Sequence, residues 1–173
     1  RWVRKWNFNL DVNIPRDQAL IQSGGKLTPG KQAYALFFPM IFADSDQIKI
    51  DSVWFEAPDE AIQNLGLNQT AASPPPNSEH HCISKTEAEA LLRQLFNDVT
   101  IKVVKTPGIM ASFGREAIYS MSDPIIIDSN RQINAGPTIK ILPVHADDNT
   151  VQLIISAEWK VRLTSAPEEP RSN

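Results

Sequence analysis

The sequence predicts an α+β fold that is mostly β, with a mixed or antiparallel sheet and one amphipathic helix, residues 84–96, packed on it. Two observations lead to this fold class. Apolar and polar residues alternate with a period of two in several segments, which is typical of half-buried strands. One segment alone spaces its apolar residues so that they form a single stripe along a helix. Turn-forming Gly, Pro, Asn and Asp residues separate these segments.

The N-terminal part of the chain predicts strands. Residues 6–13 read WNFNLDVN, so apolar side chains alternate with polar ones, as in a half-buried strand. Turns are expected at Ser23–Gly25 and at Pro29–Gly30. Tyr34–Phe42 is apolar on both faces and predicts a buried strand, in which Pro39 indicates an edge position or a bulge. The surrounding apolar run is too short to cross a bilayer as a helix.

The middle of the chain combines one strand, one short helix and a proline-rich break. Residues 48–57 are rich in β-branched and aromatic side chains and predict a strand. Residues 59–65 predict a short helix or turn that stops near Gly66. Residues 66–82 predict an exposed, extended loop, because Ala71–Ser78 has no periodicity and contains three consecutive prolines.

The amphipathic helix has a clear beginning. Ser84 and Glu87 have the spacing of a capping box, in which each side chain bonds a backbone N–H that the first helical turn leaves free. The residues that follow predict one apolar stripe: Ala88, Leu91, Leu92, Leu95 and Phe96. Asn97–Asp98 ends the helix.

The remainder predicts β structure. Strands are expected at 99–103, 116–121 and 138–144, with a break at Pro107–Gly108 and a turn at Phe113–Gly114. Asp123–Pro124 is expected to open a connection that runs to Gly136–Pro137. A turn at 147–149 precedes the longest strand, 151–163. On that strand one set of residues shares an apolar face: Val151, Leu153, Ile155, Ala157, Trp159 and Val161.

Composition excludes some classes of protein. The 173 residues carry a formal net charge of −3, so a nucleic-acid partner is not expected, because such proteins present a basic face. The single cysteine, Cys82, cannot form an intrachain disulfide. The chain begins at Arg1 and not at Met, and we therefore expect that a signal peptide or an upstream domain was removed.

Several segments of the C-terminal part occur in an order that a known family shares. They read IKIDSVWFEAPDEAIQNLGL at 48–67, EAEALLRQLF at 87–96, VTIKVVKTPGI at 99–109, SFGREAIYSM at 112–121 and AGPTIKILPVHADDNTVQLIIS at 135–156. In this order they resemble the core domain of the secretins, the ring-forming proteins of bacterial type II and type III secretion and of type IV pilus systems. The matching positions are Glu56, Gly66, Pro107, Gly114, Ala117, Gly136, Pro143 and Asp148.

The resemblance implies a domain organisation and a location. Residues 1–46 are expected to be an N-terminal β extension of the same domain. Residues 47–163 are expected to form the secretin-like core, with the proline-rich loop at 66–82 inside it, and residues 164–173 a disordered tail. The family works in the bacterial cell envelope. An extracytoplasmic location is therefore expected, either periplasmic or held at a membrane by a segment outside this chain.

One departure from the family limits what is carried over. Secretins place long amphipathic strands between the glycine turn and the later glycine, and those strands build a membrane-spanning barrel. Here only residues 122–135 fill that gap. A transmembrane strand needs about 9–11 residues, and a closed barrel needs several of them. The resemblance therefore implies a short soluble relative that lacks the pore strands, and we do not expect channel activity.

The candidates for chemistry are weak. His80, His81 and Cys82 are the one cluster of metal-ligand types, but contiguous residues in a loop are a poor start for a four-ligand zinc site. The same residues could form a thiol–imidazole pair, although no third group orients the base. Asp147–Asn149 fits a hairpin turn better than a calcium loop. We expect no cofactor and no enzymatic activity.

Two functions of different classes remain. The first is a structural or assembly domain that binds protein, either copies of itself or components of an envelope complex, through an exposed strand edge. The second is a ligand-binding module, with glycans as the candidate ligand, that uses exposed aromatic residues. Trp6, Trp54 and Trp159 lie in alternating strand patterns and are expected in the core, whereas Trp2 fits either place.

Overall fold

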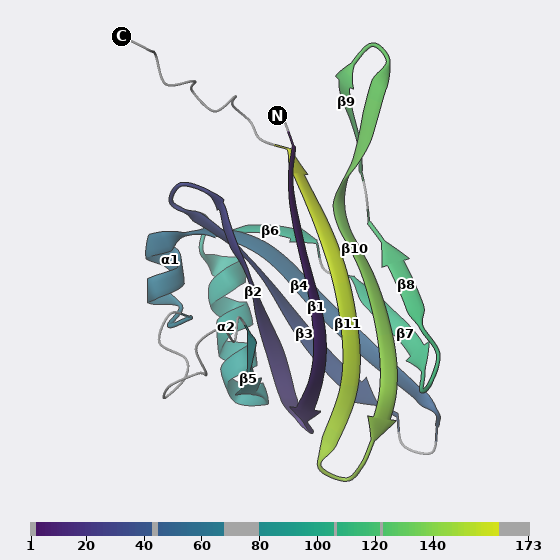
Figure 1. Ribbon diagram of the computed structural model, residues 1–173. Coiled ribbons are helices and arrows are strands. Elements are labelled where there is room, and N and C mark those ends of the chain that lie inside the picture. Colours follow the sequence, from purple (N-terminus) through teal and green to yellow (C-terminus); the bar gives the residue numbers. More distant parts are fainter. Residues whose placement is uncertain (1–2, 43–44, 68–79, 106, 122, 163–173) are drawn as a thin grey trace.

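The computed structural model describes residues 3–42, 45–67, 80–105, 107–121 and 123–162 (Figure 1). It confirms the α+β, mostly β fold class, and every strand pair in these ranges is antiparallel. The proline-rich part of the predicted loop, residues 68–79, and the predicted tail, residues 164–173, lie outside the described residues.

Two sheets form the framework. Sheet A has the order β1 (Val3–Pro15), β11 (Thr150–Arg162), β10 (Arg131–Ala146) and β8 (Ala117–Ser120), and β9 (Asp123–Asp128) also pairs with β10. Sheet B has the order β5 (His80–Ser84), β2 (Gln18–Thr28), β3 (Lys31–Ile41), β4 (Gln47–Pro58) and β6 (Lys102–Lys105), and β7 (Gly108–Ser112) also pairs with β4. The turn at Arg16–Asp17 carries the chain from sheet A into sheet B.

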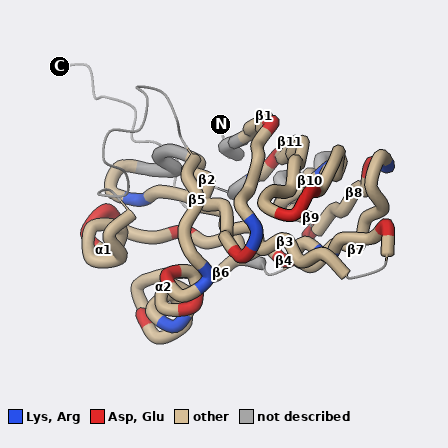
Figure 2. Tube along the Cα trace, turned by 90° about the horizontal axis from the view of Figure 1, so that it is seen from below, with Lys and Arg blue, Asp and Glu red and all other residues tan. Residues whose placement is uncertain are grey.

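Two hydrophobic cores hold three layers together. The first core lies between the sheets and contains Phe8, Phe37, Trp54, Leu153 and Trp159 among its members. The second lies between sheet B and the helices α1 (Asp59–Asn64) and α2 (Lys85–Asn97). Seen along the strands, the helices cover one side of sheet B and sheet A covers the other (Figure 2).

Sheet B has two apolar faces because one face is covered by sheet A and the other by the helices. On β3, Leu36 belongs to the helix-side core and Phe37 to the core between the sheets, and both side chains are fully buried. A strand covered on both faces reads as a continuous apolar run, because successive side chains point to opposite faces. The apolar segment at Tyr34–Phe42 therefore forms a strand that is buried over residues 34–37, as predicted, whereas Met40 near its end is 54% exposed.

Pro39 lies on a strand that has neighbours on both sides, yet it satisfies the rule for proline in sheets. Pro39 pairs with Ile50 of β4, whereas the pairing of β3 with β2 ends at Phe37, opposite Leu20. At Pro39 the strand therefore has a neighbour on one side only. A proline is tolerated at such a local edge because its missing N–H leaves no bond of the ladder unmade.

Three predicted connections and the bounds of one predicted strand are wrong. Ser23–Gly25 is not a turn but a bulged part of β2, whose register shifts between Ser23 and Gly25. Residues 80–82 are not loop but the start of β5. The strand expected at 99–103 begins at Lys102, and Val99 is 98% exposed. The connection expected at Asp123–Gly136 is a β-hairpin formed by β9 and the first residues of β10.

Helix α2 begins as predicted but does not bury its whole apolar stripe. Ser84 accepts a hydrogen bond from the Glu87 N–H, and the Glu87 carboxylate accepts one from the Ser84 N–H, so the capping box is present. Ala88, Leu91 and Leu95 are buried against sheet B. Phe96, which was expected in the same stripe, is 62% exposed because α2 covers only part of the sheet.

Candidate interaction surfaces

The histidine and cysteine cluster lies on β5, at the edge of sheet B. Ile21 pairs with His81, and Leu20 pairs with Cys82. Because neighbouring residues of a strand point to opposite faces, His81 lies on the helix side with Ile21, whereas His80 and Cys82 lie on the other side. The strand therefore separates the candidate ligands. Within the part of the chain that the structure describes, no group of three His, Cys, Asp or Glu side chains is placed to hold a metal ion.

The environment of Cys82 does not favour a nucleophile. Its side chain packs against the core between the sheets, and burial raises the pKa of the thiol. Burial lowers the pKa of His81 and the neighbouring His80 lowers it further, while Glu87 opposes the shift. A reactive cysteine needs a lowered pKa, because the thiolate is the attacking species. Cys82 and His81 also lie on opposite faces of β5.

In the acidic turn before β11, the Asp147 carboxylate is bonded to backbone N–H groups of the same turn. The Asp147 carboxylate accepts from the N–H groups of Asn149 and Thr150, each at 2.7 Å. These bonds lower the pKa of Asp147. This is the usual role of Asp in a hairpin turn, and it confirms that residues 147–149 connect two strands.

Both tryptophans whose side chains the structure describes lie in the core. Trp54 is fully buried and Trp159 is 2% exposed, with the two rings 5.4 Å apart in an edge-to-face arrangement. The Trp54 indole N–H donates to Ser52 Oγ at 3.0 Å. These two side chains are therefore not part of an exposed aromatic platform. The side chains of Trp2 and Trp6 lie outside the described part of the molecule.

Several positions of the family motif meet in the fold. Gly114 has a φ of 75° in the turn before β8, and its N–H donates to the Pro143 carbonyl at 2.7 Å. Pro143 lies at the bulge where the register of β10 against β11 shifts. Pro107 accepts hydrogen bonds from Ser52, through N–H at 2.8 Å and through Oγ at 3.2 Å. These bonds join segments that are far apart in sequence.

The remaining motif positions have structural places of their own. Gly66 has a φ of 70° just after α1, and Gly136 has a φ of 129° within β10. Ala117 packs against the core between the sheets. Glu56 is half-buried on β4, opposite Lys102 of β6, and Asp148 is exposed in the turn before β11.

The β9–β10 hairpin is a feature that sequence reasoning missed. It projects beyond the two sheets (Figure 1). Within the described residues β9 pairs with β10 alone, from Asp123–Ala135 at the base to Asp128–Arg131 at the tip. Ile126 on its surface is 71% exposed. Residues 125–127 are three consecutive isoleucines, and residues 129–130 form a turn; these were the signals for a hairpin.

Sheet A has two outer strands of opposite direction. Its pairings show that β1 runs antiparallel to β11, β11 to β10, and β10 to both β8 and β9. β9 therefore runs opposite to β1. Within the described residues β1 pairs with β11 only, over all 13 of its residues. Within the described residues, sheet A thus ends in β1 on one side and in β8 and the projecting hairpin on the other.

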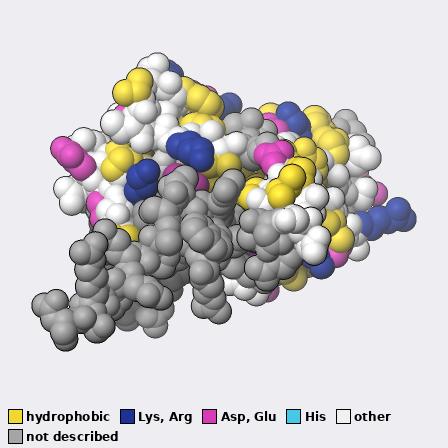
Figure 3. Space-filling view, turned by 90° about the horizontal axis from the view of Figure 1, so that it is seen from above, with side chains coloured by type: hydrophobic (Ala, Val, Ile, Leu, Met, Phe, Trp, Pro, Cys, Tyr) yellow, Lys and Arg dark blue, Asp and Glu magenta, His cyan; other side chains and the backbone are white. Residues whose placement is uncertain are grey.

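Surface charge is mixed. On the face shown in Figure 3, Lys and Arg side chains lie among Asp and Glu side chains. Among the described residues, no helix is long and apolar enough to cross a membrane.

Comparison with protein families, with curated proteins and with solved structures finds no match for this chain.

Proposed function

We propose that this chain is a non-enzymatic assembly domain that binds further copies of itself by strand pairing along the edges of sheet A. The observation that carries the proposal is the opposite direction of the two outer strands. If β9 of one copy is placed beside β1 of the next, the two strands are antiparallel. The all-antiparallel order of sheet A then continues from copy to copy.

The shape of the hairpin supports the same proposal. An isolated two-stranded hairpin is only marginally stable in water, and β9–β10 projects beyond the sandwich. An unpaired strand edge is a template for another strand, and proteins that remain monomeric usually cover or charge such edges. On β9 the three consecutive isoleucines instead keep the middle of the strand apolar. Pairing with a neighbouring copy would give β9 a second neighbouring strand and bury Ile126.

The contact between β9 and β1 joins two different surfaces. A heterologous contact of this kind closes into a ring if its rotation allows closure, and otherwise grows into a filament. The resemblance to secretin core domains supports a ring and supports the bacterial cell envelope as the location. Other envelope proteins would meet the same edges of sheet A.

The test is the mass in solution by light scattering over a wide range of concentration. We expect the wild-type chain to exceed the mass of a monomer, with a plateau for a ring and continued growth for a filament. Ile126→Lys should remain monomeric, because a lysine on an exposed edge opposes strand addition. Since Ile126 is 71% exposed, this substitution should not impair folding, which circular dichroism checks.

The matched control is Val99→Lys. Val99 is 98% exposed in the turn after α2, far from both edges of sheet A, and the substitution has the same chemistry. It should assemble as the wild type does. A wild-type chain that stays monomeric at every concentration contradicts the proposal, and so does an Ile126→Lys variant that assembles normally. A plateau at two copies contradicts the head-to-tail arrangement, since that arrangement leaves an edge free in a dimer.

A further inference from the structure

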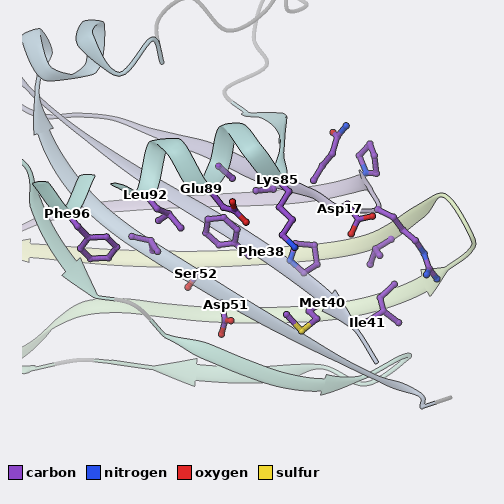
Figure 4. Close-up of a pocket in the computed structure, with 18 residues that line it drawn as sticks. Asp17, Phe38, Met40, Ile41, Asp51, Ser52, Lys85, Glu89, Leu92 and Phe96 are labelled. Atoms are coloured by element: carbon purple, nitrogen blue, oxygen red, sulfur yellow. The ribbon is translucent and has the colours of Figure 1, made fainter. Parts of the chain in front are cut away.

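A groove of about 690 Å³ runs along one flank of α2 and reaches the end of β1 at Pro15 (Figure 4). Leu92 and Phe96 of α2 form its apolar wall, and Phe38, Met40 and Val53 of β3 and β4 line its floor. The volume is within the 300–1,000 Å³ range of small-molecule pockets in proteins. The groove exists because α2 leaves this part of sheet B uncovered.

Large apolar side chains remain exposed along this groove. Phe96 is 62% exposed and Met40 is 54% exposed. A further exposed methionine, Met110 of β7, is 51% exposed and lies two strands from Met40, with Lys49 of β4 between them. Exposed apolar clusters that are bordered by polar side chains are usually binding surfaces.

The other end of the groove is polar and carries both signs of charge. The Lys85 N–H donates to the Asp17 carbonyl at 3.1 Å, which holds the first turn of α2 against the β1–β2 turn. This junction places one cationic residue, Lys85, and two anionic residues, Asp17 and Glu89, around the groove. Arg16 also lines the groove, but its Nε donates to the Asp147 carbonyl at 2.7 Å. In Figure 4 the Lys85 side chain reaches from α2 into the groove beside Phe38. Asp51 is already paired with Lys49, at 3.0 Å.

We propose that this groove binds a zwitterionic single-chain amphiphile, with its alkyl chain along Phe38, Leu92 and Phe96 and its head group at the Arg16–Asp17 turn. An anionic phosphate of the head would meet Lys85. A cationic amine would meet Asp17 and Glu89. An anionic head would lie against Asp17 and Glu89, and a cationic head would lie against Lys85, so charge complementarity selects a head group with both signs.

The length of the groove sets the length of the alkyl chain that it can bind. Lys85 and Phe96 are eleven residues apart on α2, which corresponds to roughly 16 Å at the rise of an α-helix. An extended chain advances roughly 1.2 Å per single bond, as the backbone dimensions of proteins show. A chain of about 14 carbons therefore spans the groove from the polar junction to the Phe96 ring.

The experiment is a calorimetric titration of the whole chain with tetradecylphosphocholine below its critical micelle concentration. Dodecylphosphocholine should bind about fifteenfold more weakly, since each methylene removed costs about fourfold in affinity. Tetradecyl sulfate and tetradecyltrimethylammonium, which have the same chain and heads of one charge, should each bind roughly fivefold more weakly. Equal affinity for all three heads would overturn the assignment of the polar end.

The variants are Phe96→Ser and its control Val99→Ser. Both side chains are largely exposed, so neither substitution should impair folding, and only Phe96 lines the groove. Phe96→Ser should weaken the binding of tetradecylphosphocholine at least tenfold, while Val99→Ser leaves it unchanged. Equal binding by wild type and Phe96→Ser would overturn the proposal. A self-association of the wild type that Phe96→Ser abolishes and Ile126→Lys does not would also overturn it, because a second copy would then fill the groove.

Discussion

The start of α2 shows how single residues decide where an element begins. Ser84 has extended backbone angles, φ −63° and ψ 158°, and its Oγ accepts from the Glu87 N–H at 3.2 Å. The Glu87 carboxylate accepts in return from the Ser84 N–H at 2.8 Å and from its hydroxyl at 2.7 Å. These bonds satisfy backbone donors that the first turn of a helix cannot pair by itself.

Removal of the cap should therefore destabilise the fold. We expect Ser84→Ala to lower the free energy of unfolding by about 1 kcal/mol, the usual effect of losing an N-cap side chain. Thr86→Ala in the same first turn is the control and should change stability little, because Thr86 is exposed and is not the N-cap. Urea denaturation followed by circular dichroism measures both. Equal stability of Ser84→Ala and the wild type would mean that the capping box does not stabilise α2.

The same cap predicts a dependence on pH. Hydrogen bonds from Ser84 lower the pKa of Glu87 in the folded chain. A carboxyl group with a lowered folded pKa stabilises the fold above its unfolded pKa, and this stabilisation is lost as the pH falls through the folded pKa. The difference in stability between wild type and Ser84→Ala should therefore shrink on acidification. A difference that stays constant down to acid pH would contradict this cause.

Among the elements, β10 shows how one strand serves two structures. From Arg131 to Ala135 it pairs with β9 in the projecting hairpin, and from Gly136 onward it pairs with β11 in sheet A. The change occurs at Gly136, whose φ of 129° is a conformation that residues with a Cβ rarely adopt. Nearby, the Met121 N–H donates to the Pro137 carbonyl at 2.9 Å. Gly136 thus lets the strand leave the sheet and enter the hairpin.

A side chain at this position should strain the strand. We expect Gly136→Ala to lower the free energy of unfolding by about 1–2 kcal/mol, the usual cost of a left-handed conformation for a residue with a Cβ. The control is Ala135→Gly, one residue earlier, which should cost less because it removes a Cβ and introduces no strain. Thermal unfolding compares the two variants. A Gly136→Ala variant as stable as the wild type would show that β10 tolerates another conformation at the base of the hairpin.

At the scale of the whole molecule, sheet B couples the two cores. Leu36 and Phe37 are neighbours on β3, yet Leu36 packs with the helices and Phe37 packs at the ring of Trp54, 5.9 Å away. A substitution on β3 that disrupts one core therefore also disturbs the strand that lines the other core. The three layers should therefore unfold as one cooperative unit.

Leu36→Ala tests this coupling. The substitution should lower the free energy of unfolding by about 2–5 kcal/mol, because it leaves a cavity in the helix-side core. The unfolding midpoints from circular dichroism, which reports the helices, and from tryptophan fluorescence, which reports the buried Trp54 and Trp159, should fall together. The wild type should likewise show coincident transitions. If only the circular dichroism midpoint moves, the helix layer unfolds separately from the sandwich.

Local patterns in the sequence determined much of this fold. The capping box and the spacing of Ala88, Leu91 and Leu95 predicted α2, and the alternation along β11 predicted its buried face. These signals are strong because the residues that produce them are close neighbours along one helix or strand. They also predicted the burial of Trp54 and Trp159, since each lies on the apolar face of its strand.

Only the tertiary structure decided what happens between elements. Phe96 belongs to the apolar stripe of α2 by its spacing, but it is exposed because the width of sheet B exceeds what one helix covers. His80, His81 and Cys82 are contiguous in sequence, but β5 divides them between two faces. The direction of β9 relative to β1 depends on the order of four strands in sheet A. Such relations arise from pairing and packing of distant segments, which no local pattern encodes.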